Sequence, residues 1–169
     1  MSYFKNFPQL LYSFSTGLTV SAFVVTDILR RVKMDQTDII NLLSYDEYDI
    51  LDGETPEIIA DKLYNDSNYH WVILIANEII DPRYDWPLST TALNLYITDK
   101  YGSSTASIHH YYNADGDIVH SSYAGVKYSM TNAQYETELN ETKRRIQVVK
   151  PEFVPRFVDN FVGLLKNGK

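Results

Sequence analysis

Five acidic residues crowd one short stretch of the chain and are the residues best placed to do acid–base chemistry. They are Asp46, Glu47, Asp49, Asp52 and Glu54. Two carboxyl groups at a suitable separation can act as general acid and general base, as they do in glycoside hydrolysis. A wall hydrolase also needs a deep cleft, and the sequence carries no motif of a Cys nucleophile, a serine hydrolase, a phosphate-binding loop or an HExxH metalloenzyme. We therefore expect a solvated acidic rim and a protein that is not an enzyme.

Three histidines offer the second kind of chemistry, metal binding. His109, His110 and His120 lie around a predicted β-hairpin, but adjacent strand residues point to opposite faces, so His109 and His110 are not expected to reach one ion. Asn113 to Asp117 does not fit the spacing of an EF-hand loop. The chain has no cysteine, which excludes disulfides and thiolate ligands. The sequence predicts no metal and no cofactor.

Composition narrows the class of protein further. The chain has 169 residues, of which 44% are hydrophobic and 22% charged, enough for a packed core. Fifteen basic and 22 acidic residues give a net charge of −7, which argues against nucleic-acid binding. No signal-peptide pattern is visible, and the apolar stretch Leu18 to Val25 falls far short of the roughly 20 residues of a membrane span. We expect a soluble protein without membrane insertion.

The N-terminal residues, 1 to about 25, are predicted to form an extended arm. Aromatic and aliphatic residues are crowded there without a stable period, and Pro8 and Gly17 break any helix. Such a segment has no core of its own, so it must lie against a partner, which we favour, or against the protein body. A short helix is predicted at Ile28–Val32, while Ile39–Leu43 fits either a strand or a helix.

A strand and two short helices are predicted next. The strand is Tyr48–Leu51, and a turn follows at Asp52–Thr55. Thr55 can cap the first helix, with Pro56 in its first position. Apolar residues at helical spacing define one face of each helix: Ile58, Ile59 and Leu63 on the first, and Trp71, Leu74, Ile75 and Ile79 on the second.

The middle of the chain is predicted to hold a loop, a helix and a hairpin. Two prolines make Asp81–Ser89 a loop, and Ser89 can cap a helix that presents Leu93, Ile97 and Tyr101 and ends at Gly102. The hairpin consists of residues 106–112 and 117–122, joined by the turn at residues 113–116.

The last third is predicted to be helical. Thr131–Gln134 fits a capping box, and Tyr135, Leu139, Thr142, Ile146 and Val149 then form one stripe at steps of four and three. Glu141 and Arg145 are expected to form an i,i+4 ion pair worth about 0.3 kcal/mol, and Pro151 ends the helix. A final helix begins near Pro155. Its aromatic residues Phe157 and Phe161, with Phe153 before them, fit an interface or the subunit's own core equally well.

Two resemblances give these patterns a function. The stretch Tyr48 to Asp81, with Gly53-Glu54-Thr55 and Ala76-Asn77, resembles a LysM module, in which a strand and a turn precede two helices. In such modules the turn and the loop after the second helix hold glycan, which here implies Asp52–Thr55 and Asn77–Ile80. We favour a protein neighbour on the same surface, with peptidoglycan binding as the alternative.

Most of the chain also resembles the baseplate wedge protein 53 family of contractile-tailed phages. The residues that carry this resemblance are Tyr3–Pro8 with Tyr12, Asp81–Ser89, Lys100–Gly102, His109–Tyr111, and the helix after Tyr135 with Lys150-Pro151-Glu152. The resemblance implies a non-enzymatic tail subunit that holds neighbouring wedges together. The implied partners are other wedge subunits and the sheath-initiating protein, in a multi-copy symmetric assembly in the virion.

We therefore predict an α+β protein with a LysM-like centre, a β-hairpin, an extended N-terminal arm and C-terminal helices. The expected segments are 1–43 (arm and short helix), 44–82 (LysM-like), 83–130 (loop, helix and hairpin) and 131–169 (C-terminal helices). The candidate partner-binding residues are Phe4, Phe7, Tyr12, Gly53, Thr55, Asn77, Ile79, Trp86, Phe153, Phe157 and Phe161.

Overall fold

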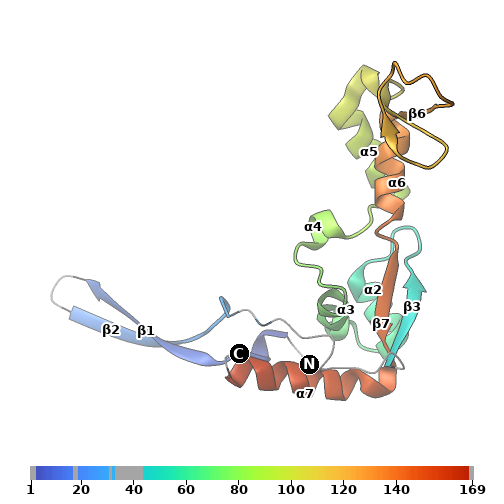
Figure 1. The fold of residues 1–169 in the computed structure, drawn as a ribbon. Coiled ribbons are helices and arrows are strands. Elements are labelled where there is room, and N and C mark those ends of the chain that lie inside the picture. The colour runs from blue at the N-terminus through green and yellow to red at the C-terminus, as the bar shows by residue number, and fades with distance from the viewer. Residues whose placement is uncertain (1–2, 17–18, 31, 33–43, 168–169) are drawn as a thin grey trace. The chain divides into compact units, whose positions relative to one another are not determined.

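A computed structural model describes residues 3–16, 19–30, 32 and 44–167 of the chain (Figure 1). It contains helices and small sheets, which confirms the predicted α+β class. The chain forms two compact units, each assembled from separated segments. Unit 1 comprises Met1–Glu47, Thr55–Ile80 and Gln147–Lys169, and unit 2 comprises Tyr48–Glu54 and Asp81–Ile146.

The N-terminal residues form regular structure, where the sequence predicts an extended arm. A short 3₁₀ helix, η1 (Tyr3–Asn6), precedes strands β1 (Gln9–Thr16) and β2 (Thr19–Thr26). The two strands are antiparallel and pair along their whole length, from Gln9 opposite Thr26 to Thr16 opposite Thr19. The strand pattern is hidden in the sequence because apolar residues occupy both faces, which removes the alternation that identifies a half-buried strand.

The short helix predicted at Ile28–Val32 is wrong for the described residues of that range. The backbone turns there, with Arg30 N donating to Asp27 O at 3.4 Å. The Arg30 guanidinium bonds the last helix, through Nη1 to Leu165 O at 2.6 Å, and this contact fixes the turn. The segment Ile39–Leu43 lies outside the described residues.

Helices α2 (Pro56–Tyr64) and α3 (His70–Ala76) confirm the two predicted helices of unit 1. Thr55 caps α2 by accepting a bond from Ile58 N at 3.4 Å, and Pro56 stands in its first turn. Asn65 ends the helix in the left-handed conformation at φ 56°. A 3₁₀ turn, η3 (Ser67–Tyr69), leads into α3. The buried residues of α3 are Trp71, Val72, Ile73 and Ala76. Of the predicted apolar face only Trp71 is fully buried, since Leu74 and Ile75 are half-buried and Ile79 lies beyond the end of the helix.

The long helix predicted from Tyr135 to Val149 is wrong in its second half. Helix α6 runs only over Asn132–Glu141, and strand β7 (Arg145–Val149) follows. β7 pairs with β3 (Tyr45–Asp49), and the flanking bonds from Ile50 N to Arg144 O and from Lys150 N to Ser44 O, both 2.9 Å, fit an antiparallel pair. Side chains in β7 alternate between exposed and buried up to Val148, as in a strand with one covered face. Ile146 and Val149 therefore fit a helical stripe by coincidence.

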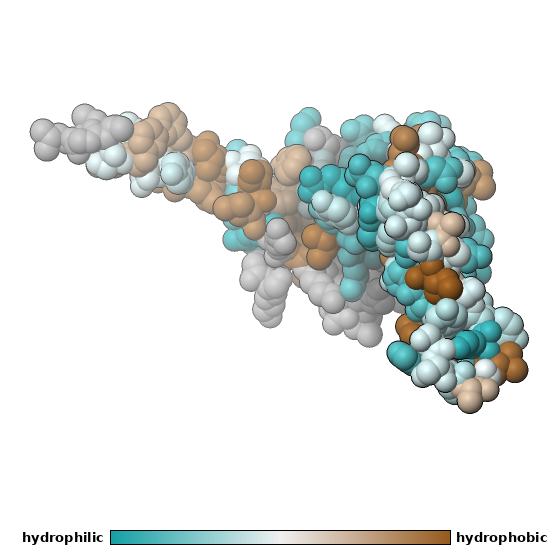
Figure 2. Space-filling view, turned by 90° about the horizontal axis from the view of Figure 1, so that it is seen from above, coloured by the Kyte–Doolittle hydropathy of each residue, from teal (hydrophilic) through white to brown (hydrophobic). Residues whose placement is uncertain are grey.

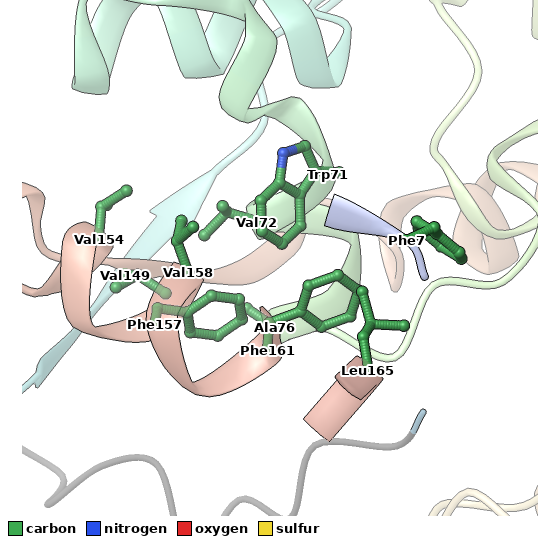
Figure 3. Packing of buried hydrophobic residues seen from close by; sticks show 10 residues of the cluster. All are labelled: Phe7, Trp71, Val72, Ala76, Val149, Val154, Phe157, Val158, Phe161 and Leu165. Atoms are coloured by element: carbon green, nitrogen blue, oxygen red, sulfur yellow. The ribbon is translucent and has the colours of Figure 1, made fainter. Parts of the chain in front are cut away.

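The core of unit 1 gathers apolar residues from distant parts of the chain (Figure 3). Helix α7 (Val154–Asn167), after the 3₁₀ turn η5 (Pro151–Phe153), confirms the predicted last helix and supplies half of the cluster. The cluster contains Phe7, Trp71, Val72, Ala76, Val149, Val154, Phe157, Val158, Phe161 and Leu165. Trp71 and Phe161 lie 5.0 Å apart between ring centroids, which places α3 directly against α7.

Unit 2 combines helices with a small sheet. Helix α5 (Thr90–Tyr101) is capped by Ser89, as predicted, and buries Leu93 and Ile97. It ends at Gly102, where φ is 50°, and η4 (Gly102–Ser104) follows. The predicted hairpin is confirmed as β4 (Ile108–Tyr112) and β5 (Ile118–Val119), and a third strand, β6 (Tyr128–Thr131), pairs with the other edge of β4.

The segment predicted as a loop at Asp81–Ser89 contains one helical turn, α4 (Pro82–Asp85). Asp81 caps this turn by accepting from Arg83 N at 3.1 Å, and Pro82 takes the first helical position, where it has no N–H to lose. The predicted capping box at Thr131 and Gln134 is confirmed at the start of α6. No described helix has both the length and the apolar character required to span a bilayer.

Candidate partner-binding site

The N-terminal segment is fixed to unit 1 by two of its aromatic residues. Phe7 is buried in the core cluster, and Tyr3 packs against Phe7 and Trp71 with ring centroids 4.9 and 5.4 Å away. Phe4, between them, is exposed over 57% of its surface. Phe4 and Phe7 are both predicted contact residues. Phe4 is available to a partner, whereas Phe7 anchors the segment to the core.

The hairpin formed by β1 and β2, here called the N-terminal hairpin, has one aromatic face. Strand alternation and the register put Leu10, Tyr12, Phe14, Phe23 and Val25 on this face. The rings of Phe14 and Phe23 stack at 5.6 Å with an interplanar angle of 10°. All five side chains are exposed, among them Tyr12, which the sequence singled out.

The opposite face of the N-terminal hairpin is aliphatic and even more exposed. Leu11, Val20 and Val24 are exposed over 69, 74 and 66% of their surfaces. In Figure 2 hydrophobic residues gather along much of this hairpin, whereas polar residues cover most of the remaining surface in view. Where the hairpin joins η1, an open hollow is lined by Phe4, Lys5, Phe7, Gln9 and Thr26. We take the two faces and this hollow together as the candidate site.

The sequence predicts a partner contact for this segment but identifies neither strand and only Phe4, Phe7 and Tyr12 as contact residues, although a further signal was present. The run from Asn6 to Thr26 contains none of the chain's 15 basic and 22 acidic residues. At the chain's average charge content, such a run would carry several charges. An uncharged, strongly apolar run outside the core is the pattern of a surface that another protein covers.

The turn at Asp52–Thr55 is held by bonds within the chain. Gly53 has a φ of 78°, and an added Cβ would meet no atom within 4 Å, so the glycine is required for its backbone conformation. The Glu54 carboxylate accepts from Tyr48 Oη at 2.9 Å and from Leu51 N at 2.9 Å. Thr55 uses its hydroxyl to cap α2. The surface of this turn is open, but its polar side chains already have partners.

Asn77 and Trp86 have roles inside their own units. Asn77 exchanges two bonds with the backbone of Gln147, donating to its O at 2.7 Å and accepting from its N at 2.8 Å. Trp86 is buried, and its Nε1 donates to Glu54 O at 2.8 Å. Ile79 is half-buried, while Ile80 beside it is 81% exposed.

The aromatic residues of the last helix divide in the same way. Phe157 and Phe161 lie inside the core cluster (Figure 3), and each is 2% exposed. Phe153 is half-buried and packs against the cluster. The sequence left an interface and a core role open for them. Their burial supports the core role, so the candidate site does not include them.

Two carboxylates of the acidic stretch, Asp52 and Asp46, interact with other residues of the chain. Asp52 Oδ1 accepts from Thr90 N at 2.7 Å and from the Thr90 hydroxyl at 3.0 Å, and these bonds lower the pKa of the Asp52 carboxyl. Asp46 lies 3.6 Å from Lys150 Nζ. A carboxyl group whose pKa is lowered stays ionised at neutral pH, which does not suit a general acid.

The histidine pair differs from the expectation. A bulge in β4 between Ile108 and His110 breaks the alternation, and the Nδ1 atoms of His109 and His110 lie 2.8 Å apart, so the argument that they point to opposite faces is wrong. His109 stacks on Tyr135 at 3.9 Å, and His120 bonds Ser122. Among the residues that the structure describes, no group of three or more potential ligands is suitable for a metal ion.

Comparisons with known proteins give the chain a family context. The family model described as base plate wedge protein 53 matches residues 4–122. The chain is 32% identical over 72 residues to a protein named baseplate wedge protein gp53 from Enterobacteria phage T4. That match covers 43% of this chain and 32% of the phage T4 protein, so the aligned part spans about a third of the relative's length.

Proposed function

Because the chain belongs to the base plate wedge protein 53 family, and so to the tail baseplate of a phage virion, we propose that it bridges neighbouring wedge subunits there as a non-enzymatic structural subunit. The proposed partners are other wedge subunits and the sheath-initiating protein. Several copies would act together in a symmetric assembly, since wedges repeat around the tail.

The N-terminal hairpin is the observation that carries this proposal. It is anchored through Phe7 and Tyr3, yet both of its faces leave large apolar side chains in contact with water. A stable monomer rarely keeps such a surface open, whereas a subunit that is completed by its neighbours can do so. Phe4 and the hollow at the base of the hairpin extend the same surface.

Internal bonding of the stretch Tyr48 to Asp81, whose sequence resembles a LysM module, supports a structural role over glycan binding. The side chains expected to line a sugar groove, Glu54, Thr55 and Asn77, bond the protein's own backbone. Leu51, Ile58 and Ile80 are exposed apolar residues in or beside the same stretch, and they suit a protein neighbour.

Density-gradient fractionation of a producing culture tests the proposal, with the chain followed by quantitative mass spectrometry in wall, free-protein and tail fractions. We expect a fixed ratio to the tail proteins, including in particles washed with high salt. Recovery with the cell wall and absence from particles would overturn the proposal and favour peptidoglycan binding.

A further inference from the structure

We propose that the N-terminal hairpin is inserted into an uncharged apolar cleft of a neighbouring baseplate protein, so that both of its faces are covered. A strand of that protein pairs with one of the hairpin's two edges, that of β1 or that of β2. This inference rests on the proposed function and adds the chemistry of one partner surface.

The two-sided character of the hairpin indicates insertion. A hairpin that lies on a flat surface needs one apolar face, with polar residues on the other. Here the aromatic face, with Phe23 52% exposed, and the aliphatic face, with Val24 66% exposed, are both apolar. A partner that covered one face would leave the other in water, so the partner surface must enclose the hairpin on both sides, as a cleft does.

Charge defines the chemistry of that partner surface. A buried charge without a partner is costly, so an interface usually matches charged groups with charged or polar groups. The hairpin offers no charged side chain, because Lys5 and Asp27 are the nearest charged residues on either side of it. The complementary surface is therefore uncharged and apolar where it meets the strands.

Backbone geometry adds a strand to that surface. Asp27 N donates to Pro8 O at 2.8 Å, which sets the hydrogen-bonded pairs of the ladder at the even-numbered residues of β1. The residues between these pairs consequently direct their backbone N–H and C=O groups away from the other strand of the hairpin. They include Leu11 and Ser13 on β1, and Ala22 and Val24 on β2. Within the described part of the chain, the sheet that contains these strands has only two members.

The same edges argue against a lipid bilayer as the partner. Outward backbone groups would have no hydrogen-bond partner in hydrocarbon, and each would cost several kcal/mol. A protein strand satisfies one row of them by joining the edge of the sheet, a common mode of recognition. A two-stranded hairpin is marginally stable alone, so added pairing also stabilises the hairpin itself.

Hydrogen exchange of the whole chain, free in solution and within purified tails, tests the edge pairing. We expect peptides from residues 9–16 and 19–26 to exchange at least about tenfold more slowly in tails, because outward amides become bonded. Unchanged exchange in tails that contain the chain would overturn the inference while leaving the proposed function intact. Absence of the chain from tails would instead refute the proposed function.

Lysine substitutions test whether both faces are covered. Phe23→Lys changes the aromatic face and Val24→Lys the aliphatic face, while Ile118→Lys, at a residue 74% exposed in unit 2, is the matched control. Each variant competes with the unmodified chain for incorporation into tails. We expect each hairpin variant to be incorporated about tenfold less often than the unmodified chain, which corresponds to about 1.4 kcal/mol of binding free energy, and the control to differ from it by less than about twofold. An effect from one face only would refute insertion. Hairpin-dependent sedimentation of the free chain with vesicles of phosphatidylethanolamine and phosphatidylglycerol would identify a membrane instead.

Discussion

Two phenylalanines of the same unit should respond to truncation in opposite ways. Phe157 lies in the core at 2% exposure, with its ring centroid 6.3 Å from that of Trp71, whereas Phe23 lies in the N-terminal hairpin at 52% exposure. Replacing a buried phenylalanine by alanine typically costs about 3–5 kcal/mol of folding free energy. Replacing Phe23, which loses only part of a burial term of about 1.5–3 kcal/mol, should cost about 1 kcal/mol or less.

Urea unfolding of the purified chain measures this difference. With a denaturant slope near 2 kcal/mol per molar urea, the Phe157→Ala variant should unfold about 1.5–2.5 M earlier, and the Phe23→Ala variant about 0.5 M earlier at most. Trp71 belongs to the same cluster as Phe157, so its fluorescence in a Trp86→Phe background reports on that core. Phe157→Leu, which retains most of the apolar volume, is the control and should lie close to the unmodified chain.

Incorporation into tails should show the reverse order. Phe23→Ala should lower the occupancy of the chain in tails, whereas folded Phe157→Leu should enter normally. Equal shifts of the unfolding midpoint for Phe157→Ala and Phe23→Ala would refute the division into a core residue and a surface residue. Loss of assembly in a fully stable Phe157→Leu variant would return Phe157 to the interface.

Three further predictions concern single contacts. Glu136 is buried, and although burial alone would raise the pKa of its carboxyl, bonds from Lys100 Nζ and Tyr101 Oη, both 2.7 Å, lower that pKa below its usual value. A lowered carboxyl pKa stabilises the fold at pH values above the unfolded-state pKa of about 4.3, and this stabilisation is lost as pH falls through the folded-state pKa. The melting temperature of the Glu136→Gln variant should therefore fall less steeply than that of the unmodified chain as pH drops below about 5. The Asn140 side chain accepts from Leu88 N at 2.7 Å and donates to Leu88 O at 3.0 Å. Asn140→Ala leaves these backbone groups without their partner, so it should lower the free energy of unfolding in urea by about 1–3 kcal/mol. A decrease below about 0.5 kcal/mol would contradict the geometry. Gly53→Ala should cost about 1 kcal/mol because φ is 78°, with Gly163→Ala, in α7 where an added Cβ meets no atom within 4 Å, as a control that gains stability.

Local signals at helix ends were readable in the sequence. Thr55, Ser89 and Thr131 were each predicted as helix caps, and each accepts the expected backbone bond. A cap depends on a few neighbouring residues, so its sequence pattern survives whatever the tertiary fold requires. The same holds for the Asn113–Gly116 turn, in which Asn113 Oδ1 accepts from Asp117 N at 2.8 Å.

Strands were harder to predict because their identity depends on distant partners. Residues 145–149 fit the period of a helix as well as that of a strand, and pairing with β3, about a hundred residues earlier in the sequence, decides between the two. The strands of the N-terminal hairpin are not recognisable in the sequence, because no covered face imposes an alternation of apolar and polar residues on Leu10–Phe14. The histidine argument failed at a β-bulge, which sequence periodicity does not reveal.

The candidate site was predictable as a region but not as a surface. The aromatic arm was identified from its composition, and Phe4 and Tyr12 are exposed as a contact role requires. Phe7, Trp86 and Phe157 share the same aromatic character but are buried. Composition alone does not distinguish an anchor from a contact residue, because the distinction depends on which side of the residue the core lies.

The segmented construction of unit 1 has a consequence for biosynthesis. Its core joins Phe7, near the start of the chain, to Trp71 and to Phe161 and Leu165, near the end of the sequence. During translation, Phe7 and Trp71 leave the ribosome before helix α7 is synthesised, so the core of unit 1 is completed only after α7 has emerged. A ribosome that stops before α7 therefore releases a polypeptide without this core, and an unfolded product of this kind is open to proteolysis.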